Sequence, residues 1–255
     1  MNRTTIYNRI TLKRAKGAAS IQPSLCFYST LETLDCLRRN RQVKLWLEFV
    51  ANHYVPKHHD VLLIYPCSAD KPYDMSRSYV QLYRTLSRLG KDRERVHVVT
   101  VSEPFGLVPE EFYGKKTRWH DWRNDWYDCP GLFKWWCKTH GTRYSEAEAD
   151  ESIRILSRYI ARFLRKVESR RRYKKIIAFV RTLSAGLKET RDQTHRRILK
   201  EAASISGVKI RMIPGSRTIS RIVQESGPYA WDMYGVAHPR AQEYLYRQLR
   251  NILND

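Results

Sequence analysis

The chain has 255 residues, of which 47 are Lys or Arg and 26 are Asp or Glu, so its formal net charge is +21. Hydrophobic residues make up 42% of the chain and aromatic residues 12%, which excludes a mainly disordered basic tail. No stretch approaches the roughly 20 apolar residues of a membrane span, and the first residues lack the apolar core of a secretory signal. We therefore expect a soluble, cytoplasmic protein whose charge favours a polyanionic partner.

The first 40 residues are expected to form a basic N-terminal arm or helical extension. The first 20 contain no acidic residue, and their basic residues are Arg3, Arg9, Lys13, Arg14 and Lys16. Such a pattern is typical of an organelle transit peptide or of an arm that lies on nucleic acid, and we favour the arm. Residues 41–255 are then expected to form one catalytic domain.

Short apolar runs and helical periodicity alternate along the rest of the chain. Apolar runs predict strands at 61–65, 96–101, 176–180 and 208–213. The first three are nearly continuous, as in strands buried on both faces, whereas the fourth alternates and favours an edge. Helices are predicted at about 41–53, 78–89, 145–169, 188–204 and 239–253. This alternation predicts an α/β fold, a three-layer domain with a mostly parallel sheet of about four strands.

The predicted helix 145–169 carries a row of basic residues. Ser145 and Glu148 form a capping box at its start. On the face opposite the apolar residues, five basic residues lie four apart: Arg154, Arg158, Arg162, Lys166 and Arg170. Like charges at this spacing repel, so a polyanion would relieve the repulsion. We predict that this row contacts a nucleic-acid backbone; the alternative is an ordinary solvated face.

Two loops that follow predicted strands carry the residues best suited to chemistry, because sites in open parallel sheets form at the carboxyl ends of strands. Residues 66–76 read PCSADKPYDMS, and residues 102–111 read SEPFGLVPEE. The first loop resembles the PCxxxKPYxxSxxH signature of the archaeosine synthase family, and the second resembles that family's SPLGLVPREL. The segment YDCP at 127–130 is similar to the family's YDIP. The resemblance covers about residues 58–130.

The resemblance implies an enzyme that adds a nucleophile to the nitrile carbon of 7-cyano-7-deazaguanine within a polynucleotide. In archaeosine synthase the nucleophile is the lysine side-chain amine and the polynucleotide is tRNA. This sequence departs from the family at the motif's final His, which is Tyr79 here, and in lacking room for transglycosylase-like and RNA-binding PUA domains. These departures favour a stand-alone, DpdC-like protein that hydrates the nitrile to the carboxamide in DNA. Lysine addition in tRNA and a non-catalytic nucleic-acid-binding protein are the alternatives.

A nitrile carbon is a soft electrophile, and a thiolate beside an ammonium suits it. Cys67 with Lys71 nearby could therefore form a thioimidate that water opens. Alternatively, Asp70 or Glu110 activates water directly as a general base. In either case Lys71 stabilises charge on the nitrile nitrogen, with Ser68 or Ser76 as a further donor. The predicted catalytic residues are Cys67, Asp70, Lys71, Ser76 and Glu110.

The predicted substrate-binding residues are Pro66, Ser68, Tyr73, Ser102, Glu103, Phe105, Gly106 and Asp128. Glu103 or Asp128 could accept hydrogen bonds from the N1 and N2 donors of guanine. Tyr73 and Phe105 could stack on a base extracted from its helix, although rings after strands more often pack in a core.

A Trp-rich insertion is predicted at about 112–144, and it holds five of the seven Trp residues. Aromatic and basic residues interleave there, which suits single-stranded nucleic acid; the alternative is a small lobe anchored by its own indoles. Its candidate zinc ligands are His120, Cys129, Cys137 and His140. Because the sequence has no CxxC pair, we expect that no cofactor is bound. The expected partners are DNA or, alternatively, tRNA, together with other proteins of a 7-deazaguanine insertion pathway.

Overall fold

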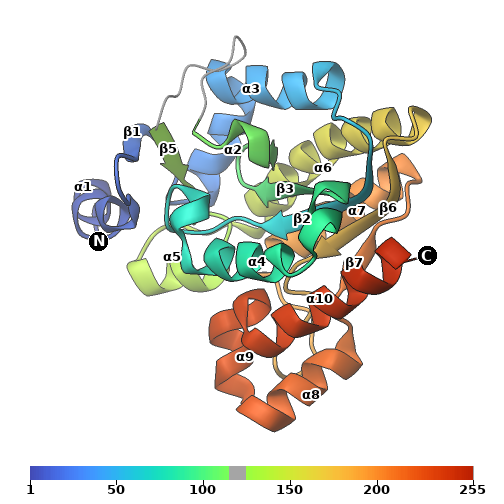
Figure 1. Ribbon diagram of the computed structural model, residues 1–255. Helices are drawn as coiled ribbons and strands as arrows, with labels where there is room; N and C mark the ends of the chain where they lie inside the picture. Colours follow the sequence, from blue (N-terminus) through green and yellow to red (C-terminus); the bar gives the residue numbers. More distant parts are fainter. Residues whose placement is uncertain (115–124, 255) are drawn as a thin grey trace.

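The four predicted apolar runs all contribute strands to one sheet in the computed structural model, which describes residues 1–114 and 125–254 (Figure 1). The strand order is β4-β3-β2-β6-β7. The bounds are β2 His59–Pro66, β3 Val96–Ser102, β4 Gly106–Pro109, β6 Tyr173–Phe179 and β7 Arg211–Ile213. All neighbouring strands are parallel except β4, which returns antiparallel to β3. The fourth run lies at an edge, as its alternation predicts.

Residues of β2 set the register of the central sheet. Leu63 is paired with Val98 of β3 and with Ile177 of β6, and all three are buried. A parallel sheet that is covered on both faces buries its strands completely, which is why these strands read as continuous apolar runs. The carboxyl ends of β2, β3 and β6 consequently lie side by side at one edge.

Helices cover both faces of this sheet (Figure 1). Tyr65 of β2 contacts Ser78 and Gln242, which places α4 and α10 on one face. On the other face, α6 packs against α7 and the start of β4. The helix bounds are α1 Arg3–Ile6, α2 Thr30–Arg39, α3 Arg41–Glu48, α4 Arg77–Ser87, α5 Lys134–His140, α6 Glu146–Ser169, α7 Thr194–Ser206, α8 Ser216–Ser226, α9 Pro228–Tyr234 and α10 Pro239–Asn254. The three-layer α/β architecture predicted from the sequence is therefore confirmed.

Helix boundaries differ most from the sequence pattern where the helices are short or begin at loops. The predicted helix 41–53 is α3 followed by a π-helical turn, Phe49–His53. Ser145 does cap α6, and its hydroxyl accepts a hydrogen bond from the Glu148 amide at 3.5 Å. The predicted helix 188–204 begins only at Thr194, after a loop.

The first 40 residues pack on the domain instead of extending from it. Ile6 and Ile21 are buried, and β1, Ser20–Cys26, is paired in parallel with β5, Asp125–Asp128. This two-stranded sheet is missed by the sequence reasoning because β1 contains Pro23 and β5 has only four residues. The start of the chain thus forms one wall beside the carboxyl edge of the central sheet. Among the described residues, no helix is long and apolar enough to cross a membrane.

Candidate active site

A cleft of about 670 Å³ opens at the carboxyl ends of β2, β3 and β6. Its floor consists of residues that follow these strands, and its walls come from the N-terminal segment, α5, the start of α7 and α9. The volume lies within the usual range for small-molecule sites. The described lining residues carry four basic and four acidic side chains: Arg14, Lys71, Arg181 and Arg196, and Glu103, Asp128, Asp192 and Asp232. With His counted as neutral, as in the net charge of +21 for the chain, the cleft is therefore formally neutral.

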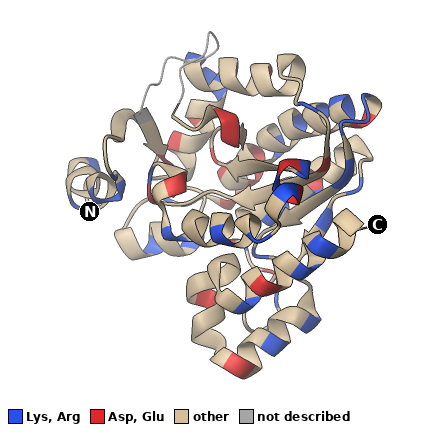
Figure 2. Ribbon diagram, viewed as in Figure 1, with Lys and Arg blue, Asp and Glu red and all other residues tan. Residues whose placement is uncertain are grey.

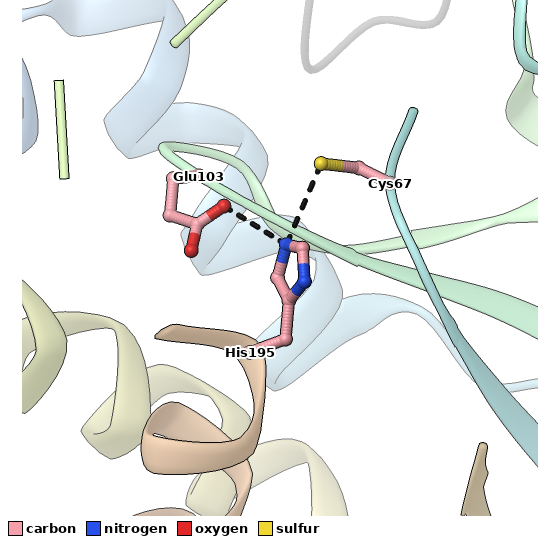
Figure 3. A group of neighbouring side chains, drawn as sticks. All are labelled: Cys67, Glu103 and His195. Carbon is pink, nitrogen blue, oxygen red and sulfur yellow. Dashed lines mark hydrogen bonds and ion pairs between the residues drawn. The ribbon is translucent and has the colours of Figure 1, made fainter. Parts of the chain in front are cut away.

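Three side chains converge at the floor of the cleft (Figure 3). Cys67 follows β2, Glu103 follows β3, and His195 is the second residue of α7. The Nε2 atom of His195 lies 3.5 Å from the Sγ atom of Cys67 and 3.1 Å from the Oε2 atom of Glu103. The side chains of His195 and Glu103 are 14% and 1% exposed. Both partners approach the same ring nitrogen.

Backbone and side-chain hydrogen bonds fix the position of Cys67. The Cys67 amide donates to the Val101 carbonyl of the neighbouring strand at 3.0 Å. The hydroxyl of Tyr79, from α4, donates to the Pro66 carbonyl at 3.2 Å. These bonds continue the β2–β3 pairing as far as Cys67 and present its thiol to the cleft. The loop at 66–76, which carries the first family motif, is called the motif loop below.

The charges of Glu103 and His195 support one another. Burial alone would raise the pKa of Glu103, but the charge of His195 and its hydrogen bond lower that pKa below its usual value. Burial alone would likewise lower the pKa of His195, and the charge of Glu103, followed by Cys67, raises it well above the usual value. The second carboxylate oxygen, Oε1 of Glu103, is buried and accepts no hydrogen bond from the described residues.

Lys71 lies beneath the motif loop and is only 3% exposed. Its ammonium donates to the Ser68 carbonyl and lies 5.0 Å and 5.3 Å from the ring centroids of Tyr73 and Tyr127. Burial lowers the pKa of Lys71, and the nearby Cys67 opposes this shift. Lys71 therefore helps to hold the loop through its contact with the Ser68 carbonyl, and its role in stabilising charge on the nitrile nitrogen stays a prediction.

Asp128 is committed to an ion pair inside the cleft. The Nη1 atom of Arg14 lies 2.6 Å from Oδ1 and 2.5 Å from Oδ2 of Asp128, and Thr11 donates to Oδ2 at 2.7 Å. The side chains of Arg14 and Asp128 are 17% and 4% exposed. Both oxygens already have partners, so Glu103, with one unpartnered oxygen, is the better placed of the two predicted acceptors for a guanine edge.

Three predicted catalytic residues lie away from the converging groups. Glu110 forms an ion pair with Arg93 at 2.7 Å and lies beside Val98. That position is four residues along β3 from Ser102, which corresponds to about 13 Å, so Glu110 cannot serve the cleft. Ser76 is fully buried as the N-cap of α4. Asp70 is absent from the described residues that line the cleft, although both of its neighbours line it.

The predicted stacking residues are also placed differently. Tyr73 and Phe105 are fully buried, and the ring of Phe105 packs against Tyr127 with centroids 4.3 Å apart. Neither ring is accessible for stacking on a base, so both aromatics are core residues, as the alternative predicts. Two exposed aromatics line the cleft instead: Trp135, at 55% exposure, and Tyr234, at 38%.

The remaining predicted substrate-binding residues divide between cleft and core. Pro66, Ser68 and Ser102 line the cleft. Gly106 begins β4 with φ +67°, and a Cβ there would lie 3.0 Å from Leu47 Cδ2, so its role is packing. Trp119 and Trp122 of the predicted insertion lie outside the described residues.

Tyr79, which replaces the final His of the family motif, is a core residue. It is fully buried, stacks against Tyr73 with centroids 5.2 Å apart, and hydrogen-bonds to Thr100. It does not belong to the described lining of the cleft. The replacement of the family's His by Tyr79 therefore alters the packing beneath the motif loop. It does not alter the described lining of the cleft.

The basic row on α6 is partly occupied by contacts within the chain. Arg154 pairs with Glu151 and Arg162 with Glu48, while the Lys166 ammonium donates to the Val50 carbonyl at 2.8 Å. Burial, followed by the charge of Arg170, lowers the pKa of Lys166 to about 8. Arg158 and Arg170 are exposed. Basic residues are also spread over α4, α8 and α10 (Figure 2), so a nucleic-acid contact by the α6 row stays a prediction.

The metal ligands suggested by the sequence do not come together. The Cys129 thiol lies 3.5 Å from the Thr33 hydroxyl, that of Cys137 donates to the Gly131 carbonyl, and His140 contacts the Trp136 carbonyl. His120 lies outside the described residues. Among the described residues, the group with metal-ligand spacing has one ligand atom from each of three side chains within 4.8 Å: Cys67, Glu103 and His195.

His195 is the member of this cluster that the sequence reasoning misses. It lies within a predicted helix, where a single His between Thr194 and Arg196 gives no periodic signal. The available signal was its place in the first turn of a helix that follows a buried strand, since such turns point toward the carboxyl edge of a parallel sheet.

Comparisons with known proteins place the motif loops in a described family. Residues 43–118 match the model of a domain of unknown function, DUF5591. Over 164 residues the chain is 30% identical to archaeosine synthase subunit alpha of Thermoplasma acidophilum, covering 63% of this chain and 26% of that protein. The corresponding protein of Thermococcus kodakarensis is 40% identical over 80 residues, covering 31% and 14%.

The relatives confirm the resemblance that the motifs indicate. Archaeosine synthase subunit alpha of Methanosarcina acetivorans is 38% identical over 80 residues, covering 31% of this chain and 12% of that protein. The chain thus spans about a quarter or less of the length of these curated relatives. Closeness to a DpdC-like protein stays a prediction. The solved structure of AF0587, a protein of unknown function, is similar over 71% of this chain and 49% of the AF0587 chain. The TM-score is 0.39 and the sequence identity is 18%.

Proposed function

We propose that this chain, whose core is archaeosine-synthase-like, adds a nucleophile to the nitrile carbon of 7-cyano-7-deazaguanine within a polynucleotide. The observation that carries the proposal is the convergence at the cleft floor. Cys67 and Lys71 of the first motif and Glu103 of the second meet there with His195. Residues of both family motifs therefore serve one cleft, and they supply a nucleophile, a proton donor and stabilising charge for addition to an electrophilic carbon.

Lysine addition in tRNA is the version of the reaction that we favour. The relatives named above are archaeosine synthases, and the family chemistry implied by the motifs uses the lysine amine. The departure at Tyr79, which favours hydration on DNA in the sequence alone, lies in the core and does not alter the described lining. Hydration of the nitrile in DNA is the second candidate, since water and an amine can open the same intermediate.

The geometry suits a covalent intermediate better than direct attack by water. The Cys67 thiolate forms a carbon–sulfur bond to the nitrile carbon, and the nitrile nitrogen takes a proton from His195 to give a thioimidate. The amine then adds to the same carbon, the carbon–sulfur bond breaks, and Cys67 leaves as a thiolate. The proton lost by the amine returns to His195. The product is an amidine, and no oxidant or reductant is needed.

The two residues predicted to act as general bases for direct attack by water are not among the described residues that line the cleft. Glu110 lies about 13 Å along β3 from the cleft end of that strand and is paired with Arg93. Asp70 is outside the described lining. Cys67, by contrast, lines the cleft and lies 3.5 Å from the Nε2 atom of His195.

The neutral cleft suits a neutral base, whereas the basic surface suits phosphates. Trp135 and Tyr234 are the exposed aromatics of the lining and offer faces on which a base could stack. The unpartnered Oε1 atom of Glu103 could accept from the N1 or N2 donors of guanine. A base in this cleft must leave its helix, since the reacting groups lie at the floor.

Mass spectrometry of released nucleosides tests the proposal directly. The chain is incubated with tRNA and with DNA that carry 7-cyano-7-deazaguanine, each with and without free lysine. We expect a lysine adduct on tRNA that disappears in Cys67→Ala and persists in Cys129→Ala, whose thiol also lines the cleft. A lysine-independent gain of water on DNA would establish the second candidate. No change on either substrate would refute both and leave a binding protein.

Intact-protein mass spectrometry tests the covalent step by itself. Incubation with the free base 7-cyano-7-deazaguanine, without amine, should add the mass of one base to the protein. The adduct should be absent in Cys67→Ala and present in Cys129→Ala. Turnover without any adduct, even when the reaction is quenched rapidly, would refute the thioimidate.

A further inference from the structure

Hydrogen bonding alone accounts poorly for the arrangement of Cys67, Glu103 and His195. In a nucleophile–histidine–acid arrangement the acid contacts one ring nitrogen and the nucleophile the other. Here Sγ of Cys67 and Oε2 of Glu103 both approach Nε2 of His195, at 3.5 Å and 3.1 Å (Figure 3). One proton on Nε2 can be directed at only one of them. A thiol, a carboxylate and an imidazole nitrogen gathered at one point are a donor set that a bound cation holds together.

Two of the three separations are close to the edges of a tetrahedral zinc site. Bonds of about 2.3 Å to sulfur, 2.0–2.1 Å to nitrogen and 2.0–2.2 Å to oxygen place sulfur about 3.6 Å and oxygen about 3.4 Å from the nitrogen at tetrahedral angles. The observed separations are 3.5 Å and 3.1 Å, and all three ligand atoms lie within 4.8 Å of one another.

We propose that Cys67, Glu103 and His195 bind one zinc ion, with the fourth coordination position open to the cleft. A thiolate, an imidazole and a carboxylate form a ligand set that zinc accepts, and three protein ligands with one open position are typical of reactive zinc centres. A thiolate and a carboxylate together balance the two charges of the ion.

Burial supports a preformed site. The Glu103 side chain is 1% exposed, and its Oε1 atom accepts no hydrogen bond from the described residues. An ionised carboxylate is costly to bury with half of its acceptor capacity unused. A zinc ion at Oε2 would balance the buried negative charge of the carboxylate and leave Oε1 free for a second contact.

Zinc binding and the covalent step oppose one another, and this consequence rests on the proposed function. Coordination to zinc draws electron density from the sulfur, so the zinc-bound thiolate should be a much weaker nucleophile toward the nitrile carbon. Zinc should therefore silence the enzyme reversibly and protect Cys67 from alkylation. The site would then respond both to the nitrile base and to the concentration of free zinc.

Cobalt substitution tests the metal site without relying on activity. The full chain is stripped with a chelator and titrated with Co²⁺, and then with Zn²⁺ in competition. We expect one equivalent to bind, with the visible bands of a four-coordinate ion and a sulfur-to-cobalt charge-transfer band. Cys67→Ser should abolish the charge-transfer band, and Glu103→Gln and His195→Asn should each weaken binding by more than about 100-fold. Cys129→Ser and Cys137→Ser are the matched controls, because their thiols lie outside the cluster.

The outcomes separate the zinc site from the proposed reaction. Absence of one-equivalent binding in the folded wild-type chain, or binding that survives His195→Asn and Glu103→Gln, would overturn the zinc site. If the metal-free chain forms the thioimidate and zinc suppresses it, both proposals stand. If the zinc-loaded chain turns over and the metal-free chain does not, the zinc site stands and the covalent step falls. Circular dichroism of each variant confirms that the chain is folded.

Discussion

The ion pair between Arg14 and Asp128 should be one of the more costly single contacts to remove. Replacing Arg14 with Met keeps most of the side-chain volume but leaves the Asp128 carboxylate, 4% exposed, with the Thr11 hydroxyl as its one remaining side-chain partner among the described residues. Removing one partner of a buried ion pair costs about 3–5 kcal/mol. For a chain of this size each kcal/mol corresponds to about 2–4 °C, so Arg14→Met should lower the Tm by about 6–20 °C.

Urea unfolding of matched variants measures this cost. Arg221→Met serves as the control, because its ion pair with Glu225 at 2.9 Å is exposed and should be worth about 0–1 kcal/mol. The double variant Arg14→Met with Asp128→Asn should lose less stability than Arg14→Met alone, since no buried charge is left unpaired. A loss for Arg14→Met no larger than that for Arg221→Met would refute the argument that this pair is buried and coupled.

Other parts of the fold and cleft give further expected outcomes. Trp135→Ala should raise the KM for the modified polynucleotide by about 5- to 150-fold through lost stacking of about 1–3 kcal/mol, whereas Tyr229→Ala, exposed outside the described lining, should not. Gly106→Ala should lower the free energy of unfolding by about 1–3 kcal/mol, because φ is +67° and the new Cβ would lie 3.0 Å from a buried Leu methyl; an unchanged urea midpoint would contradict this. Burial alone would raise the pKa of Asp60, but hydrogen bonds, chiefly from Lys174, lower it. Its stabilisation is therefore present above about pH 4 and lost progressively as the pH falls further, so Asp60→Asn should cost about 2 kcal/mol at pH 7 and less at each lower pH below about 4, as seen in parallel urea titrations.

The central sheet was predictable because its signal is local. Val61, Val98 and Ile177 lie in runs of apolar and β-branched residues, and a parallel sheet buried on both faces requires such runs. The Ser145 cap of α6 is a local signal of the same kind. The pairing of β1 with β5 joins segments about 100 residues apart, and Pro23 within β1 hides its strand character.

The site was predictable only in its loops. Cys67 and Glu103 were found because both follow strands that end at the same edge of the sheet. His195 was missed because its role depends on where α7 begins, which no periodicity in the sequence reveals. Glu110 and Phe105 were misplaced because β4 turns back along β3: one residue is carried toward the far end of the sheet and the other into the core.

The N-terminal segment ties the loop at 66–76 to the loop that begins at Asp128. Lys16 donates its amide to the Lys71 carbonyl at 2.7 Å, and Lys71 donates its amide to the Arg14 carbonyl at 2.8 Å, while the Arg14 side chain binds Asp128. This strap lies outside residues 43–118, the part that matches the family model. A protease that cut the chain just after Lys16 would therefore release both loops at once, and the site could be dismantled while every reacting side chain stayed intact.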